Sequence, residues 1–373
     1  MLKTLSGSIA LFMLTALTAL AVLAGTAHAA AQPPTHARKI VLEKAETGYR
    51  WKLVEAPVPQ PGARQVLVRV HAVGLNRGDW EVLGSNNSNG TLVGRIPGSD
   101  AAGEIVAVGK HVKEFRPGAR VTSLYFRNWT DGTASKEILN GAHGFDVDGV
   151  LGEYVVLEDT AVVAAPRSLD YEEAATLPTA GLTAWNATVG KNELRDRVVL
   201  VQGTGGVSIF ALQFANAAKA RVIATSSSDE KLAGVRKLGA RDGINYRTYP
   251  NWSEQVTALT GGHGADLVVD VGGKETLEQS VKSLAYGGML SIVGGLSGYD
   301  GTISSLGLLN KTASARGVFV GSRADYQRMA AFIEQHQLHP VIDKVFTLDE
   351  FDAALQHLRT GNPVGRVVLK LVR

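Results

Sequence analysis

The sequence predicts an α/β protein in which a β-rich portion is followed by a doubly wound parallel sheet. From Ile40 to about Ala165, short alternating segments are separated by Gly and Pro turns, which is typical of antiparallel strands. From Arg197 onwards, apolar strands are separated by helices of ten or more residues, as in a parallel sheet. The length of 373 residues agrees with this division, because roughly 150 residues per domain gives two domains or slightly more.

The composition excludes several classes of protein. With 45% hydrophobic and 20% charged residues, the chain is neither disordered nor a multi-span membrane protein. Lys and Arg total 38 against 35 Asp and Glu, without long basic runs, which argues against nucleic acid as a partner. The chain has 0 Cys, so disulfides, thiol nucleophiles and thiolate zinc sites are excluded. The 42 glycines are the unusual feature that remains to be explained.

The N-terminus has the pattern of a secretory signal peptide over residues 1–29. Lys3 precedes the uncharged apolar stretch 9–23, and Ala27 and Ala29 form a small-x-small cleavage pattern. Cleavage after Ala29 predicts a periplasmic or secreted protein without a membrane span. An uncleaved anchor is the alternative, because roughly 20 apolar residues span a bilayer; the protein is cytoplasmic if the signal is not used.

The individual elements follow from local patterns. In the β-rich portion, strands are expected at 66–70, 103–109 and 153–157, followed by a short helix around 171–175. Further along, strands are expected at 198–201, 221–225, 267–271 and 290–293. The end of the chain is expected to form two helices after Tyr326 and a last strand over 366–372.

A glycine-rich turn joins the strand 198–201 to an amphipathic helix. The turn contains Gly203, Gly205 and Gly206, and the helix has its apolar residues at i, i+3, i+4, i+7, i+8 and i+11 from Val207. Unpaired backbone N–H groups and the positive end of the helix dipole would suit a pyrophosphate there. The alternative is an ordinary tight turn between a strand and a helix.

The position that reads the ribose of a dinucleotide favours NADP(H). It lies 23 residues after Gly203, at the end of the second strand, and it holds Ser226 where NAD sites favour an acidic residue. Ser226 and Lys231 would bind a 2′-phosphate; the alternative is a helix N-cap followed by a solvated Lys. Further glycines, Gly272 and the pair Gly294 and Gly295, end later strands, where a cofactor needs room.

At this point the sequence resembles the medium-chain dehydrogenase/reductases, specifically their quinone oxidoreductase-like and alcohol dehydrogenase-like members. The resemblance extends from about Lys39 to Arg373, and the matching segments are 74–79, 97–103, 117–121, 177–185, the glycine turn and 231–246. It implies a GroES-like β-rich barrel domain over 38–165 and 321–373. A Rossmann NADP-binding domain over 166–320 would be inserted between them, with a substrate cleft where the two meet.

The same resemblance implies further site residues and a partner. Thr179, Val207 and Tyr246 would join the glycines in binding the cofactor. Relatives usually form homodimers by joining the edges of their Rossmann sheets, and Val318-Phe319-Val320 resembles such an edge.

The positions of the family's zinc ligands decide the expected chemistry. Zinc-dependent members hold the metal with a Cys, a His followed by Glu, and a second Cys, where this sequence has Asn76, Ser99 with Asp100, and Thr179. One carboxylate cannot hold a zinc ion, so no metal is expected. The four-cysteine zinc lobe is also missing, with the insertion 126–150 in its place, and His336 and His339 are interpreted as a helix end.

Without a Lewis acid, deprotonating an alcohol is difficult, whereas a quinone or an enone needs only hydrogen-bond donors at its oxygen. We therefore expect NADPH-dependent hydride transfer to such a small-molecule acceptor, with Asn76 and Thr183 as the catalytic residues. Asp79 is interpreted as holding its loop or as a helix N-cap. Glu81 replaces a tyrosine of some quinone-reductase relatives, which leaves the proton donor open. Four aromatic residues would either stack on a flat acceptor or belong to the core: Trp80, Tyr125, Phe126 and Trp129.

Two alternatives remain open from the sequence. The second half of the chain is similar to the alcohol dehydrogenase-like branch, which would make the protein a carbonyl or alcohol oxidoreductase. The lost ligands and the absent tyrosine also permit an NADPH-binding sensor without turnover.

Overall fold

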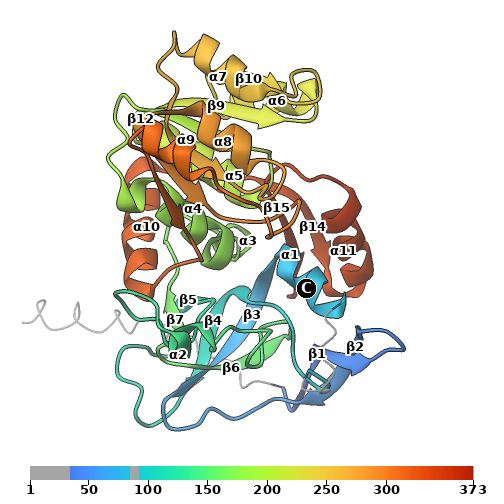
Figure 1. Cartoon of the computed structure of the whole chain (residues 1–373). Helices are drawn as coiled ribbons and strands as arrows, with labels where there is room; N and C mark the ends of the chain where they lie inside the picture. The colour runs from blue at the N-terminus through green and yellow to red at the C-terminus, as the bar shows by residue number, and fades with distance from the viewer. Residues whose placement is uncertain (1–33, 85–91, 373) are drawn as a thin grey trace, which may run out of the picture. The chain divides into compact units, whose positions relative to one another are not determined.

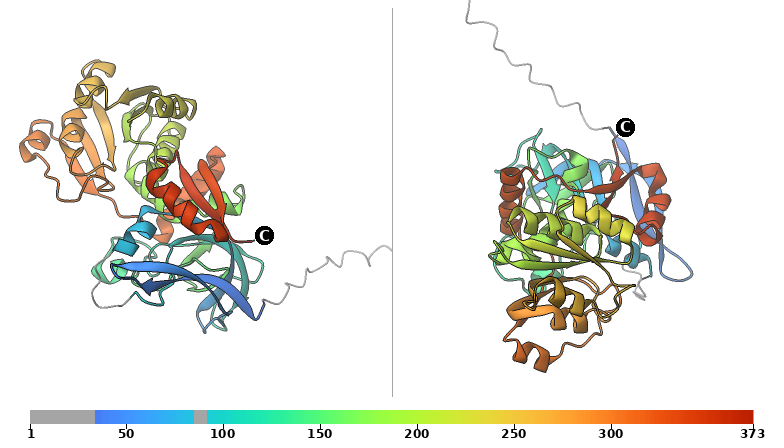
Figure 2. Two further views of the ribbon diagram at one scale, coloured as in Figure 1. Left: turned by 90° about the vertical axis from the view of Figure 1, so that its right-hand side faces the viewer. Right: turned by 90° about the horizontal axis from the view of Figure 1, so that it is seen from above.

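The computed structural model describes residues 34–84 and 92–372, so the predicted signal peptide lies outside the described residues. This part of the chain contains a seven-stranded sheet, a six-stranded parallel sheet and the antiparallel pair β1 (His36–Lys44) and β2 (Tyr49–Pro57) (Figures 1 and 2). The predicted α/β fold class, with a β-rich portion and a parallel sheet, is confirmed.

The seven-stranded sheet has the order β14-β15-β3-β4-β5-β7, and β6 also pairs with β3. Its strands are β3 (Gln65–Leu75), β4 (Asp100–Val108), β5 (Arg120–Ser123), β6 (Tyr154–Glu158), β7 (Val162–Ala164), β14 (Ile342–Thr347) and β15 (Arg366–Lys370). The last strand therefore returns to the first part of the chain, where Val367 lies opposite Leu75 in an antiparallel ladder. This pairing brings Arg366 next to the end of β3.

The six-stranded sheet has the order β10-β9-β8-β11-β12-β13, and every pairing in it is parallel. Its strands are β8 (Val198–Gln202), β9 (Arg221–Ser226), β10 (Asp242–Asn245), β11 (Ala265–Asp270), β12 (Leu284–Ile292) and β13 (Ser314–Gly317). In β8, Val199 and Val201 belong to one buried cluster while Val198 and Leu200 belong to another. Because side chains alternate along a strand, both faces of this sheet are covered.

Helices cover both of these faces. One face packs against α5 (Gly206–Ala217) and α6 (Asp229–Lys237), and the other packs against α7 (Trp252–Leu259) and α8 (Leu277–Ser283). Because all strands are parallel, their carboxyl ends lie at one edge, where the glycine turns are found.

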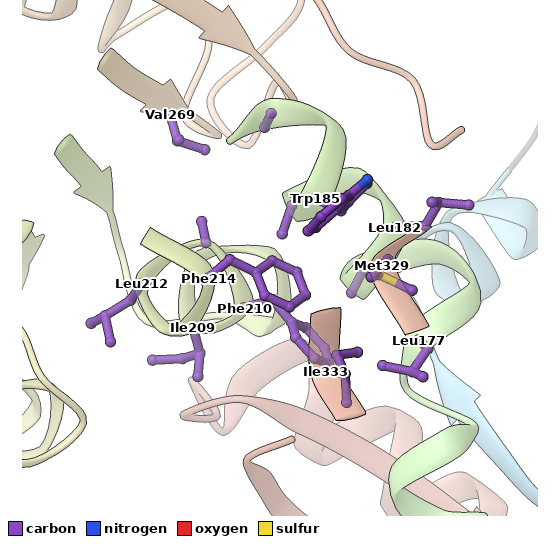
Figure 3. Close-up of a cluster of buried hydrophobic side chains, with 14 of the residues drawn as sticks. Leu177, Leu182, Trp185, Ile209, Phe210, Leu212, Phe214, Val269, Met329 and Ile333 are labelled. Carbon is purple, nitrogen blue, oxygen red and sulfur yellow. The ribbon is translucent and has the colours of Figure 1, made fainter. Parts of the chain in front are cut away.

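A buried aromatic core fixes the helices that carry the candidate site. It lies between α4 (Leu182–Ala187), α5 and α10 (Arg323–His336), and Figure 3 shows Phe210 and Phe214 of α5 beside Trp185 and Met329. Trp185 and Phe214 meet edge to face with their ring centroids 5.8 Å apart. Truncating a side chain such as Phe214 to Ala would cost about 3–5 kcal/mol. This packing holds α4 firmly against α5.

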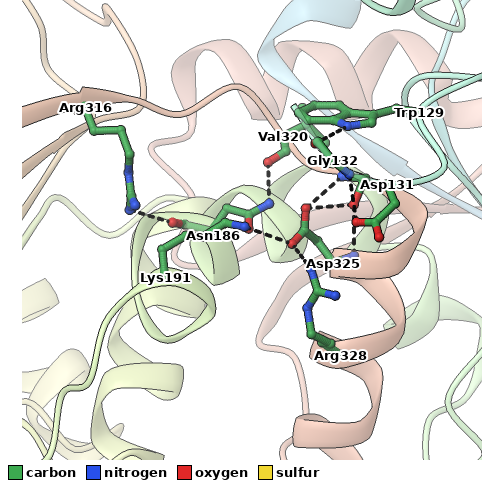
Figure 4. A network of polar contacts seen from close by, with 10 residues as sticks. Trp129, Asp131, Gly132, Asn186, Lys191, Arg316, Val320, Asp325 and Arg328 are labelled. Carbon is green, nitrogen blue, oxygen red and sulfur yellow. Dashed lines mark hydrogen bonds and ion pairs between the residues drawn. The ribbon is translucent and has the colours of Figure 1, made fainter. Parts of the chain in front are cut away.

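A polar network holds the segment that leaves the six-stranded sheet (Figure 4). Arg316 Nη2 donates to the backbone oxygen of Asn186, and Asn186 Nδ2 donates to the backbone oxygen of Val320, both at 2.9 Å. Val320 has a φ of +55°, in the left-handed region. The expected edge strand at 318–320 is therefore wrong: the edge strand is β13, and after one more backbone bond, from Val318 N–H to the Ile292 carbonyl at 2.9 Å, the chain leaves the sheet.

The remaining elements are short connections and the helices around the last strands. They are α1 (Arg77–Glu81), η1 (Val82–Gly84), α2 (Lys136–Leu139), α3 (Tyr171–Ala174), the π-helical turn η2 (Leu177–Gly181), η3 (Val189–Lys191), α9 (Ser305–Asn310), η4 (Leu348–Glu350) and α11 (Phe351–Thr360). Within residues 34–84 and 92–372, no helix is both long and apolar enough to cross a bilayer.

Candidate functional site

Asn76 occupies the junction between β3 and α1. It is the N-cap residue of α1, with φ −114° and ψ 158°, and its backbone N–H donates to Asp79 Oδ2 at 2.7 Å. Its amide Nδ2 lies 3.3 Å from Ser99 Oγ. Asp79 is thus the third residue of the helix and holds the loop through Asn76, so the N-cap interpretation of Asp79 is wrong.

Asp100 gathers the other polar side chains around it. Ser99 Oγ donates to Asp100 Oδ1 at 2.7 Å, and the backbone N–H and hydroxyl of Thr179 both donate to this carboxylate, the N–H at 3.1 Å. Arg366 Nη2 lies 3.3 Å from Asp100 Oδ2, and both side chains are buried. The four residues at the family's zinc-ligand positions therefore form one hydrogen-bonded group with Arg366. We call this group the Asp100 cluster: Asn76, Ser99, Asp100, Thr179 and Arg366.

The Asp100 cluster does not fit a zinc ion. The groups that could bind a metal are one amide, two hydroxyls and one carboxylate. That carboxylate already accepts hydrogen bonds from Ser99, Thr179 and Arg366. Elsewhere in the described part of the chain, no three His, Asp or Glu side chains come close enough to hold a metal ion. His339 is paired with Glu173 at 2.7 Å rather than with His336.

Burial dominates the electrostatics of this cluster. Burial, with a smaller contribution from Asp100, raises the pKa of Asp79 to about 7, against the opposing effects of the Asn76 N–H bond and of Arg366. Burial also raises the pKa of Asp100, against the opposing effects of Arg366 and the Thr179 hydroxyl. Each ion of a buried pair loses its hydration, so the hydrogen bonds around Asp100 are needed to keep its charge.

The glycine turn has a separate reason for each glycine. Gly203 has a φ of +74°, which favours glycine, and a Cβ on Gly205 would meet no atom within 4 Å. A Cβ on Gly206 would lie 2.5 Å from Cδ of Arg366. The predicted cradle therefore has an open surface at Gly205, while Gly206 makes room for an arginine; Val207 follows in the first turn of α5.

Arg366 links the glycine turn to the Asp100 cluster, and no local pattern indicates this role. Gly365 N–H donates to the Thr204 carbonyl at 3.0 Å, which fixes the start of β15 beside the turn. Arg366 Nε is buried without a hydrogen-bond partner among the described residues. Its role depends on a contact with Asp100 that spans 266 residues, which no spacing rule detects.

Ser226, predicted at the ribose, lies beside Tyr246, whereas the predicted Lys231 contacts the tail of the chain. Ser226 ends β9 with 2% of its surface exposed, and its carbonyl accepts from the Tyr246 N–H at 3.0 Å. Lys231 lies in α6, which is N-capped by Ser228. Its Nζ donates to the Asn362 carbonyl at 2.5 Å, and burial lowers the pKa of Lys231. The N-cap is therefore Ser228 rather than Ser226, and Lys231 is not simply solvated.

Asp270 holds the backbone at Gly272, and the sequence motifs did not indicate this role. The Asp270 carboxylate accepts from the N–H of Gly272 at 3.0 Å and from Gln202 Nε2 at 3.1 Å, so it ties β8 to β11. Gly294 and Gly295 follow β12, and a Cβ on Gly295 would lie 2.6 Å from the ring of Tyr299. An Asp that ends an apolar strand just before two glycines was the available signal.

Thr183 is placed apart from the hydrogen bonds of the Asp100 cluster. It follows Thr179 by four residues, in α4 directly after the π-helical turn, and 5% of its surface is exposed. Residues four apart on a helix lie on the same side, so Thr183 extends the row that Thr179 begins.

Two pockets of the described residues lie away from these groups. One of about 500 Å³ lies where α5 and α10 end and includes Gln213, Asn216 and His336. The other, of about 180 Å³, is lined mainly by residues of β1, β2 and β6. Neither contains a predicted site residue, so the candidate site is assigned from its side chains and not from a cavity.

Comparison with known proteins identifies two family models. The alcohol dehydrogenase GroES-like domain matches residues 62–167, and the zinc-binding dehydrogenase model matches residues 206–335. The second match begins in the glycine turn, and the first contains Asn76 and Asp100.

Individual relatives cover most of the chain. A zinc-type alcohol dehydrogenase-like protein of Schizosaccharomyces pombe is 42% identical over 328 residues, 85% of this chain and 94% of that protein. The quinone oxidoreductase of Sus scrofa is 28% identical, over 85% of this chain and 92% of that protein. The crystal structure of a putative alcohol dehydrogenase from Sinorhizobium meliloti 1021 is 41% identical, covers 91% of this chain and 100% of its own, and has a TM-score of 0.86. An NAD-dependent alcohol dehydrogenase structure is 33% identical over 90% of this chain and 100% of its own, with a TM-score of 0.79.

Proposed function

Since this chain belongs to the medium-chain dehydrogenase/reductase family, we propose that it transfers a hydride from NADPH to a quinone or an α,β-unsaturated carbonyl without a metal ion. The observation that carries this proposal is the Asp100 cluster, in which an amide and hydroxyls replace a zinc ligand set. An acceptor that is already electrophilic can be reduced with hydrogen-bond donors alone.

In this reaction the chain's own residues have to stabilise the charge that develops on the acceptor. When bound, the nicotinamide supplies the hydride, and charge then develops on the carbonyl oxygen of the acceptor. Asn76 Nδ2 carries two hydrogens and points one toward Ser99, so the second is available to that oxygen. Ser99 is itself oriented by Asp100, whose carboxylate accepts a hydrogen bond from the Ser99 hydroxyl. The cluster thus holds the amide in a fixed direction, and a donor held in advance is worth more than solvent.

NADPH is proposed over NADH because β9 ends without a carboxylate. Ser226, Lys231 and Tyr246 present hydroxyl groups and one cation at that end of the sheet. For a 2′-phosphate to bind, Lys231 would exchange its bond to the Asn362 carbonyl for a charge-assisted bond. Arg366 adds a cation beside the first turn of α5, where a pyrophosphate would bind.

The test is oxidation of NADPH followed spectrophotometrically with a panel of quinones, enones and aldehydes. The proposal expects turnover of quinones or enones by protein that contains no zinc, unaffected by a chelator, with NADH much poorer than NADPH. One tightly bound zinc per chain, with activity lost to the chelator, would overturn it. NADPH binding without turnover of any acceptor would favour the sensor.

A second candidate is a carbonyl or alcohol oxidoreductase. It is favoured by the 42% identity to a zinc-type alcohol dehydrogenase-like protein, which exceeds the 28% identity to a quinone oxidoreductase. Alcohol oxidation with NAD⁺ or NADP⁺, at a rate comparable to quinone reduction, would support this candidate.

We also propose that the protein forms a homodimer through the edge of the six-stranded sheet. β13 pairs only with β12 within the described residues, and α9 beside it exposes Leu306 by 62% and Leu309 by 71%. An open strand edge next to exposed apolar side chains is a common site of association. Light scattering after gel filtration should give twice the chain mass, and Leu309→Glu should give the single mass.

The localisation proposed from the sequence is periplasmic or secreted, after cleavage behind Ala29. N-terminal sequencing of the protein from cell fractions tests it. A mature N-terminus at Ala30 outside the cytoplasm is expected, and an intact Met1 in the cytosolic fraction would contradict it.

A further inference from the structure

A group of aromatic side chains joins the β-rich portion to the segment after the parallel sheet. Tyr125 follows β5, and its ring centroid lies 4.7 Å from Phe126, 6.1 Å from Phe145 and 5.9 Å from Phe319. Phe126 and Phe319 meet edge to face at 5.3 Å. We call these four residues the aromatic wall: Tyr125, Phe126, Phe145 and Phe319.

The Phe145 end of the aromatic wall contacts the candidate site. A Cβ on Gly78 would lie 2.8 Å from Cζ of Phe145, so this ring rests on α1, the helix that Asn76 caps. Burial raises the pKa of Tyr125, and the charges of Asp79 and Asp100 add to this effect. Tyr125 is therefore linked through the Phe145 ring to α1, the helix that begins after Asn76.

The Tyr125 hydroxyl is not used by the fold. Among the described residues, the Tyr125 hydroxyl has no hydrogen-bond partner. The ring of Tyr125 is largely buried, but its hydroxyl oxygen is not among the buried atoms that lack a partner. Burial and the carboxylates of Asp79 and Asp100 raise the pKa of Tyr125 above its usual range, so the hydroxyl keeps its proton. A phenylalanine would pack equally well here, which leaves the hydroxyl without a structural reason.

We propose that Tyr125 is a second catalytic donor, whose hydroxyl gives a hydrogen bond to the carbonyl oxygen of the acceptor. This inference rests on the proposed function. The hydride forms a C–H bond at the acceptor, the π-electron pair moves to the carbonyl oxygen, and NADPH is oxidised to NADP⁺. Tyr125 and Asn76 stabilise that oxygen, and a proton from solvent completes the reduced product. Glu81 stands where some relatives have a tyrosine, and Tyr125 supplies the missing hydroxyl from the segment that follows β5.

The test compares Tyr125→Phe with Tyr249→Phe, an exposed control. We expect Tyr125→Phe to lower kcat/KM for enones and quinones about tenfold to a hundredfold, since one such donor is typically worth ~10²–10³ and Asn76 remains. The dissociation constant of NADPH and the Tm should stay at their wild-type values. Tyr249→Phe should leave all of these unchanged.

The outcomes separate this inference from the proposed function. If the wild type reduces enones or quinones and Tyr125→Phe reduces them at least half as fast, the inference is overturned and the proposed function stands. A loss of Tm or NADPH affinity equal to the loss of activity would also overturn it, because the hydroxyl would then be structural. If the wild type reduces none of these acceptors while it binds NADPH, the proposed function itself fails.

Discussion

At residue 76, an amide performs two tasks that can be separated. Asn76 caps α1 and points its Nδ2 toward Ser99. Asn76→Ser keeps a good N-cap but removes the amide donor. We expect kcat/KM for the acceptor to fall by about 10²–10³, with stability and NADPH affinity near the wild-type values. Steady-state kinetics and a thermal melt measure this, and an unchanged kcat/KM would exclude Asn76 from catalysis.

Ser226 is predicted to set the choice of cofactor. A carboxylate there would repel a 2′-phosphate and accept from the ribose hydroxyls, so Ser226→Asp should shift the ratio of NADPH to NADH affinity by at least about tenfold, or 1.4 kcal/mol. Ser228→Asp is the matched control, because Asp also serves as an N-cap for α6. Titration of both cofactors by fluorescence gives the ratio. Equal shifts in the two variants would point to a general charge effect and not to recognition at Ser226.

The raised pKa of Asp79 predicts that the protein becomes more stable as the pH falls. Its pKa is raised by burial from 3.8 to about 7, so between these values the folded protein holds a proton that the unfolded chain releases. The free energy of unfolding should therefore rise as the pH falls from 8 to 5. In Asp79→Asn, which still accepts the Asn76 N–H, this contribution of at most about 4 kcal/mol should be absent.

Urea unfolding of both proteins at pH 8 and pH 5 measures the difference. Asp79→Asn should be the more stable protein at pH 8, with a smaller advantage at pH 5. Asp131→Asn, at an exposed position, serves as the control. An advantage that grows as the pH falls would show that the Asp79 pKa is lowered by folding.

At the scale of elements, the glycine turn separates ligand contact from packing. Gly205→Ala meets no protein atom within 4 Å at a φ of −73°, whereas Gly206→Ala would place a Cβ 2.5 Å from Arg366. Gly205→Ala is expected to weaken NADPH binding about tenfold with little change of Tm, because its methyl would face the cofactor. Gly206→Ala should lower both NADPH affinity and Tm, because Arg366 must move away from Asp100.

Binding titrations and thermal melts distinguish these two variants. Equal loss of Tm in both would show that the surface at Gly205 is not open. Wild-type NADPH affinity in Gly205→Ala would place the phosphates elsewhere.

Most elements were predictable from the sequence because their signals are local. The strand 198–201, the turn and the helix after it combine period-2 and period-3.6 patterns with glycine at a left-handed position, and the structure has β8 and α5 there. The strand predicted at 318–320 was wrong. Its composition favours a strand, but Val320 has a left-handed conformation and its carbonyl accepts a hydrogen bond from Asn186. That contact joins residues 134 apart, which no local pattern detects.

At the scale of the whole molecule, the predictable part of the site is the part carried by motifs. The glycines, Ser226 and Asn76 follow from spacing and from the family resemblance. Arg366 and Asp270 act through partners on other strands, and their roles appear only once the strand order is known. The use of Lys231 was equally hidden, because its partner Asn362 lies in the returning tail.

Because β15 pairs with β3, the seven-stranded sheet joins a segment that is synthesised early to one that is synthesised much later. Asp100 leaves the ribosome 266 residues before its cationic partner Arg366. Until then the interior around Asp100 would hold a carboxylate without its counter-ion, which favours an open or protonated nascent chain. A chain that ends before residue 366 would lack β15 and this pair together, so the site can be completed only after residue 366 has left the ribosome.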